Sequence, residues 1–84
     1  MPYIPAPKIL IAFPDAQPVK PKTPIQGGGG LRKRWKDLTG NIYEWDSRHG
    51  TVEKYNKKGK HLGEYSPETG KQLNPPNPEY EVEP

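Results

Sequence analysis

Three residues that could carry out acid–base chemistry lie close together in the stretch NIYEWDSRHGTVEKY, residues 41–55. They are Asp46, His49 and Glu53: a carboxylate, an imidazole and a second carboxylate around an expected turn. Such groups suit the cleavage of RNA by its own 2′-hydroxyl, which needs a base, an acid and positive charge near the phosphate. The same residues would also suit the polar surface of a small hairpin, and spacing alone leaves both interpretations open.

The chemistry gives each member of this trio a role. Glu53 would be the base that removes the 2′-hydroxyl proton, and His49 the acid that protonates the leaving 5′-oxygen. Asp46 would orient His49 and raise its pKa, because a nearby anion favours the imidazolium. Positive charge for the transition state would come from a nearby basic side chain, and the candidates are Arg48, Lys60 and Arg34.

The middle of the chain is basic. Residues 31–60 hold nine basic and four acidic residues, a local net charge of +5, which suits a polyanionic partner, although the run RKRWK would also suit a solvated strand face. Tyrosines in this region offer faces on which unpaired bases can stack, whereas Trp35 and Trp45 are expected in the core of so small a module. The expected RNA-binding residues are Arg32, Lys33, Arg34, Lys36, Tyr43, Arg48, Tyr55, Lys57, Lys58, Lys60 and Lys71.

Short strands are the elements that must position these residues. Segments rich in β-formers alternate with glycine-containing polar turns of hairpin length. The expected strands cover residues 31–38, 42–46, 51–55, 61–65 and 71–73. Asp46 and Glu53 can share one face of the central hairpin, with His49 at its rim, although the sequence does not fix the register. The sequence therefore predicts a mainly β fold, a small, highly twisted antiparallel meander without helices.

Residues 1–30 are expected to form an extended arm. Seven prolines in this segment forbid a long helix and any central strand, so polyproline-like chain is the default. The run GGGG at 27–30 predicts a flexible joint, which places the boundary of a folded module, residues 31–84, immediately after it. The apolar run ILIAF, residues 9–13, is the one part of the arm suited to docking on another surface.

Composition limits the classes of protein to which the chain can belong. A chain of 84 residues with 30% hydrophobic residues is one small domain, and the absence of cysteine removes disulfides and thiolate metal sites. No apolar run approaches the ~20 residues of a membrane span. His49, His61 and the acidic residues lack a recognised metal-ligand spacing, so no metal or other cofactor is expected.

The segments RKRW, IYEWDSRHGTVEKY and GKHLGEYSPETGKQL, followed by a proline-rich close, resemble the cytotoxic ribosomal RNase domain of cloacin and the rRNA-cleaving colicins. The upstream segments YIPAPK and PKTPIQGGGG resemble that family's linker into the nuclease. The resemblance covers most of the chain. In the family's pattern the catalytic Asp, His and Glu fall on Asp46, His49 and Glu53, and two further aromatic positions fall on Tyr43 and Tyr55.

The resemblance implies a twisted antiparallel β domain, secreted as part of a larger toxin. Such a domain acts in the cytoplasm of a target bacterium, where it cuts 16S ribosomal RNA in the decoding centre without a metal. The implied partners are the ribosome and a tightly binding acidic immunity protein, and we expect a monomer that acts on RNA rather than DNA and does not itself insert into membranes.

One departure from the family's pattern lies in the tail. Residues 74–84 hold three acidic residues and no basic residue, and Tyr80 stands where the family has a catalytic arginine. Lys71, Lys60 or Arg48 would have to replace that arginine, or the enzyme is weaker; the acidic tail could instead alter the choice of immunity protein. Two rival interpretations remain: a non-catalytic β module that binds RNA or protein, and an RNase with a different RNA target.

Overall fold

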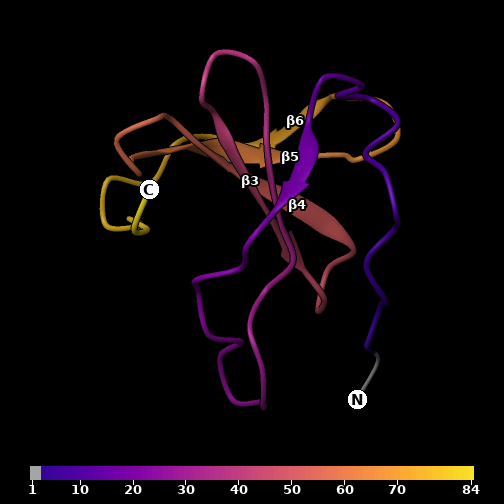
Figure 1. Ribbon diagram of the computed structural model, residues 1–84, viewed down its shortest axis with the longest axis vertical. Coiled ribbons are helices and arrows are strands. Elements are labelled where there is room, and N and C mark those ends of the chain that lie inside the picture. Colours follow the sequence, from indigo (N-terminus) through magenta and orange to yellow (C-terminus); the bar gives the residue numbers. More distant parts are fainter. Residues whose placement is uncertain (1–2) are drawn as a thin grey trace.

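The computed structural model describes residues 3–84 and contains one antiparallel sheet, in which each strand pairs with the next along the chain (Figure 1). The strands are β1 (Gln17–Val19), β2 (Arg34–Lys36), β3 (Ile42–Asp46), β4 (Thr51–Tyr55), β5 (His61–Tyr65) and β6 (Gln72–Asn74). Within residues 3–84 there is no helix, and hence none long and apolar enough to cross a membrane. The predicted mainly β meander is confirmed.

The three central strands have the bounds that their alternating patterns predict, whereas the outer strands differ. β2 is shorter than the expected strand at 31–38, and β6 begins one residue later than expected. β1 lies in the arm, where extended polyproline-like chain was the default. Its Pro18 pairs with Trp35 of β2, and because β1 is the edge of the sheet, a residue without an N–H group is tolerated there.

The arm covers one face of the sheet and completes the hydrophobic core. Trp35, Tyr43, Trp45 and Val52 project from this face and pack with Leu10 and Ala16 of the arm, with Ala6, Phe13 and Tyr65 around them. Trp35 is 0% and Trp45 6% exposed, so the prediction that both tryptophans are core residues is confirmed. Backbone hydrogen bonds tie the arm to the turns of the sheet, from Ile4 N to Ser47 O at 2.8 Å and from Ala12 N to Pro67 O at 3.0 Å.

The glycine run belongs to the long loop between β1 and β2, which projects away from the sheet (Figure 1). A bridge between Pro24 and Leu31 closes the loop, together with a 3.0 Å hydrogen bond from Ile25 N to Gly30 O. Chain on both sides of residues 27–30 therefore contributes to one sheet. The first two residues of the arm lie outside the described part.

The opposite face of the sheet is polar and is covered in part by the C-terminal tail, residues 75–84. Its buried polar and charged side chains are Arg34, Glu44, Thr51, Glu53 and His61, and Ile42 and Tyr55 are buried beside them. The tail comes back to the turn before β5, where Val82 N donates to Gly59 O at 2.9 Å. Gly59 has a φ of +86°, and a Cβ there would lie 2.0 Å from Val82 O. Only glycine therefore permits both this turn and the close approach of the tail.

Candidate active site

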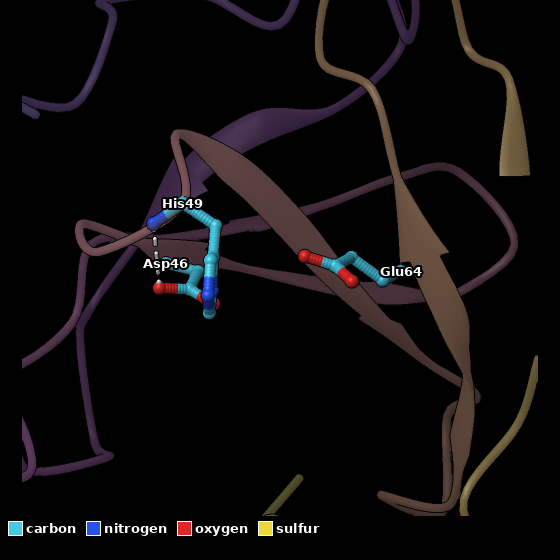
Figure 2. Close-up of side chains that lie close together, drawn as sticks. All are labelled: Asp46, His49 and Glu64. Atoms are coloured by element: carbon cyan, nitrogen blue, oxygen red, sulfur yellow. Dashed lines mark hydrogen bonds and ion pairs between the residues drawn. The ribbon is translucent and has the colours of Figure 1, made fainter. Parts of the chain in front are cut away.

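Asp46 and His49 form a pair in the turn that links β3 to β4 (Figure 2). Asp46 ends β3, and its Oδ1 accepts the backbone N–H groups of Arg48 at 2.9 Å and His49 at 3.3 Å. Its Oδ2 lies 2.8 Å from Nδ1 of His49. The His49 side chain is 67% exposed, whereas that of Asp46 is 13% exposed. The turn thus holds a solvent-facing imidazole against an anchored carboxylate.

This pairing shifts both groups toward their charged forms. The hydrogen bond and the negative charge of Asp46 raise the pKa of His49. Burial alone would raise the pKa of Asp46, but the hydrogen bonds from the His49 ring and from two backbone N–H groups outweigh it and lower that pKa. The pairing with Asp46 therefore favours the imidazolium form of His49, the form that a general acid needs.

Glu53 lies on β4, on the same face of the sheet as Asp46. Its Oε1 is 2.7 Å from Nε2 of His61, which is on β5. Burial raises the pKa of Glu53, partly opposed by the hydrogen bond from His61 and reinforced by the negative charge of Glu64. A carboxylate with a raised pKa is a stronger base than an ordinary one.

Glu64 adds a third carboxylate that the sequence did not single out. It pairs with Glu53 across β4 and β5, accepts a 2.5 Å hydrogen bond from Thr51 Oγ1, and accepts another from the Asn74 amide. Figure 2 shows its carboxylate near the Asp46–His49 pair, and one potential ligand atom from each of these three residues lies within 4.8 Å of the others. Two carboxylates and one imidazole are a donor set that could hold a transition metal.

The trio of Asp46, His49 and Glu53 opens onto two adjoining hollows, of about 480 Å³ and 620 Å³. The trio and Tyr80 line both of them. The first hollow continues past His61 and Glu64 along the proline-rich segment 74–78. The second continues toward Arg32 and Arg48, between the β1–β2 loop and the tail. Together they form a groove with the acid–base groups at its middle.

The expected RNA-binding residues are not all brought to this groove. Arg32, Arg48 and Tyr55 line it. Arg34 is 1% exposed, and its guanidinium lies 2.7 Å from Glu44 Oε2. Arg34 also donates to the backbone oxygen of Glu83 at 2.8 Å, so its charge is neutralised beneath the tail rather than presented to solvent.

The other expected cations lie around the rim or on separate surfaces. Lys60 forms a 2.5 Å ion pair with Glu81 of the tail. Lys33 covers the Trp35 ring on the core side, and Tyr43 is in the core, donating from its hydroxyl to Asp37 at 2.8 Å. Four further lysines lie outside the groove: Lys36 is on β2, and Lys57, Lys58 and Lys71 are in the connections between strands.

Sequence reasoning missed His61 and Glu64 as site residues because a bulge changes the register of β5. Tyr55 pairs with His61, whereas Lys54 pairs with Gly63, so one extra residue lies on β5 between these pairs. Residues three apart on a regular strand face opposite sides, and the bulge brings both side chains to the same side. The one signal in the sequence is Gly63, because a glycine inside a strand often marks a bulge.

Comparisons with known proteins give a consistent set of relatives. A sequence model of the family described as Cytotoxic matches residues 4–83. Colicin E3 of Escherichia coli is 49% identical over 84 residues, covering 95% of this chain and 15% of that protein. Cloacin of Escherichia coli is 46% identical over the same shares, and colicin-E6 of Escherichia coli is 54% identical over 65 residues, covering 75% of this chain and 12% of that protein. The chain thus spans at most 15% of the length of these curated relatives.

Proposed function

Because this chain belongs to the family of Cytotoxic domains, we propose that it is a ribonuclease that cuts 16S ribosomal RNA in the decoding centre and thereby halts translation. The observation that carries the proposal is the pairing of an imidazole held by Asp46 with a carboxylate held by His61 in one groove. This arrangement supplies an acid and a base for a reaction whose nucleophile, the 2′-hydroxyl, belongs to the substrate.

The proposed reaction is a transesterification in which two side chains transfer protons. Glu53 removes the proton of the 2′-hydroxyl, and the resulting oxyanion attacks the adjacent phosphorus. The bond from phosphorus to the 5′-oxygen breaks, and the His49 imidazolium gives its proton to that oxygen. The products are a 2′,3′-cyclic phosphate and a free 5′-hydroxyl.

Electrostatic features of the groove support these roles. The raised pKa of Glu53 makes its carboxylate a stronger base, and the raised pKa of His49 favours the protonated form of the acid. Arg48 and Arg32 line the same groove and would stabilise the negative charge that develops on the phosphate oxygens. No step requires a metal ion or another cofactor.

The wider biology is proposed on the same basis. The domain would be carried within a larger secreted toxin, reach the cytoplasm of a target bacterium, and there bind the ribosome through phosphate contacts. An acidic immunity protein would protect the producing cell by covering the basic rim of the groove. The short share of each relative that this chain matches fits a nuclease module of a longer protein.

The test uses purified protein and intact bacterial ribosomes in EDTA, with the ends of the 16S RNA mapped after incubation. One discrete cut near the 3′ end is expected, and it should disappear in Glu53→Gln and His49→Ala. Glu68→Gln is the matched control, because Glu68 is an exposed residue outside the groove. Absence of a cut with the wild-type protein would favour a binding module, and scattered cuts in other RNAs would favour a different RNA target.

A further inference from the structure

The C-terminal tail makes a direct contact with the residue that holds the base. The backbone N–H of Asn77 donates to Nδ1 of His61 at 2.9 Å. The other ring nitrogen of His61, Nε2, lies 2.7 Å from Glu53 Oε1. A continuous chain of hydrogen bonds thus runs from the tail backbone through one imidazole to the carboxylate of Glu53.

The direction of this chain follows from the donors available. A backbone N–H can only donate, so Nδ1 of His61 must accept and cannot carry a proton of its own. The ring proton is therefore on Nε2, from which it is donated to Glu53. This is the arrangement in which the carboxylate stays an acceptor, as a base must be before it takes a proton.

The His61 ring is also fixed in place by two aromatic side chains. The Tyr55 ring meets it at 5.2 Å and 62°, and the Tyr80 ring meets it at 5.1 Å and 66°, both edge to face. Tyr55 comes from β4, whereas Tyr80 comes from the tail. The His61 side chain is 3% exposed, and the tail supplies both the hydrogen bond to its ring and one of its two aromatic contacts.

The tail is held against the sheet at several points beyond Asn77. Tyr80 N donates to Asn77 O at 3.0 Å, which closes a turn over His61. Farther along, Glu81 pairs with Lys60 at 2.5 Å, and the Pro84 backbone oxygen accepts from Lys22 Nζ at 2.6 Å. Glu81, one of the acidic residues of the tail, thus has a structural use, since its ion pair helps to hold the segment that contacts His61.

We propose that the tail completes the catalytic base: the Asn77 N–H fixes His61 as its Nε2–H tautomer, and His61 in turn orients Glu53 toward the substrate. This inference rests on the proposed function, because it assigns a positioning role in that reaction. Asn77 and His61 are positioning residues that do not exchange a proton with the RNA, whereas Glu53 takes the proton of the 2′-hydroxyl.

The decisive variant is Asn77→Pro, which removes the donating N–H, beside Asn77→Ala, which keeps it. Asn77 follows Pro76 and precedes Pro78, so the surrounding chain already has the extended conformation that proline favours. Two measurements are made on each protein: the ¹⁵N shifts of the His61 ring at neutral pH, and the single-turnover rate of 16S RNA cleavage in ribosomes.

The wild type and Asn77→Ala should show one protonated nitrogen, Nε2, in the His61 ring. Asn77→Pro should show a mixture of tautomers or a doubly protonated ring. Its cleavage rate should fall at least tenfold, which is part of the ~10²–10⁴-fold rate enhancement that a positioned base contributes. Asn77→Ala should cleave faster than Asn77→Pro, because it loses only the Oδ1 that accepts from Glu79 N at 3.0 Å and keeps the N–H that fixes the His61 tautomer.

The inference is overturned if the wild-type ring is protonated on Nδ1, a measurement that does not depend on any variant folding. It is also overturned if Asn77→Pro changes the tautomer and cleaves at the wild-type rate. A wild-type protein that has the Nε2–H tautomer but cuts no ribosomal RNA would refute the proposed function alone, while the ¹⁵N spectrum would still support the link between tail and His61.

Discussion

Leu10 offers the sharpest test of whether the arm is part of the folded unit. It is 1% exposed and packs in the core with side chains of the sheet. Leu10→Ala removes most of that buried side chain and leaves a cavity, which costs about 2–5 kcal/mol in well-packed cores. A chain of 84 residues has a total stability of roughly 4–13 kcal/mol, so this one change would remove a large part of it.

The expected loss can be expressed as a melting temperature. At about 4–8 °C for each kcal/mol in a domain of this size, a loss of ~3 kcal/mol lowers Tm by about 12–24 °C. Thermal and urea unfolding followed by circular dichroism would measure it. The matched controls are Ile9→Ala and Ile11→Ala, which change neighbours that are 67% and 68% exposed, and which should each lower the stability by less than about 0.5 kcal/mol.

The reasoning is refuted if Leu10→Ala is no more destabilising than its two neighbours. That result would mean that the arm is a linker and that the chain after the glycine run folds without it. The expected result would instead mean that any active fragment must include residues from about 10 onward. At temperatures where Leu10→Ala remains folded, it should still cleave RNA, because Leu10 lies on the face opposite the groove.

Three further predictions concern charged groups. Asp46→Asn should move the high-pH limb of the cleavage rate to lower pH, because Asp46 raises the pKa of His49 and the general acid is lost as pH rises through that pKa. Single-turnover rates measured from pH 5 to 9 would show this shift, and an unchanged high-pH limb would contradict the prediction. Zn²⁺ should inhibit cleavage reversibly, since Asp46, His49 and Glu64 present ligand atoms within 4.8 Å, and titration should show weaker inhibition in Glu64→Gln than in the wild type. Arg34→Met should cost about 3–5 kcal/mol in urea unfolding by leaving Glu44 buried and unpaired, and Arg34→Met/Glu44→Leu should recover much of the loss; if Arg34→Met instead weakens only ribosome binding, the guanidinium serves RNA and not the fold.

Local patterns were sufficient for the central part of the fold. Alternation of β-formers and polar turns located β3, β4 and β5 to the residue. The expectation that Asp46 and Glu53 share a face follows from the same alternation, and the observed register, in which Asp46 pairs with Thr51, agrees with it. These features depend on neighbours within one hairpin, and that is why sequence periodicity finds them.

Features that depend on distant segments were not predictable in this way. β1 is three residues of an arm rich in proline, and it becomes a strand because β2 offers an unpaired edge. Leu10 is buried because it packs against the tryptophans of the sheet, and no pattern within ILIAF predicts that contact. The role of His61 depends on a bulge in β5 and on a backbone N–H sixteen residues farther along the chain.

The two faces of the sheet explain how so polar a chain can fold and still hold reactive groups. Only 30% of its residues are hydrophobic. Most of the buried ones form a core on one face of the sheet, where the arm packs. The other face buries charged groups in pairs, Arg34 with Glu44 and His61 with Glu53, although Glu44 Oε1 has no hydrogen-bond partner within residues 3–84. Burying such groups would be costly in isolation, and the tail reduces that cost with backbone hydrogen bonds to Arg34 and His61.

The same covering of the polar face gives the site its chemistry. A carboxylate in open solvent keeps its ordinary pKa, whereas Glu53 has a raised pKa chiefly because it is buried. His49, in contrast, stays exposed at the mouth of the groove, where it can reach a leaving group and exchange protons with water. The proposed base thus lies in the covered part of the sheet and the proposed acid in a turn at its edge. An acidic tail that looks unsuited to an RNA-cutting protein is therefore consistent with one, because its contacts hold the segment that hydrogen-bonds to His61, the partner of the proposed base Glu53.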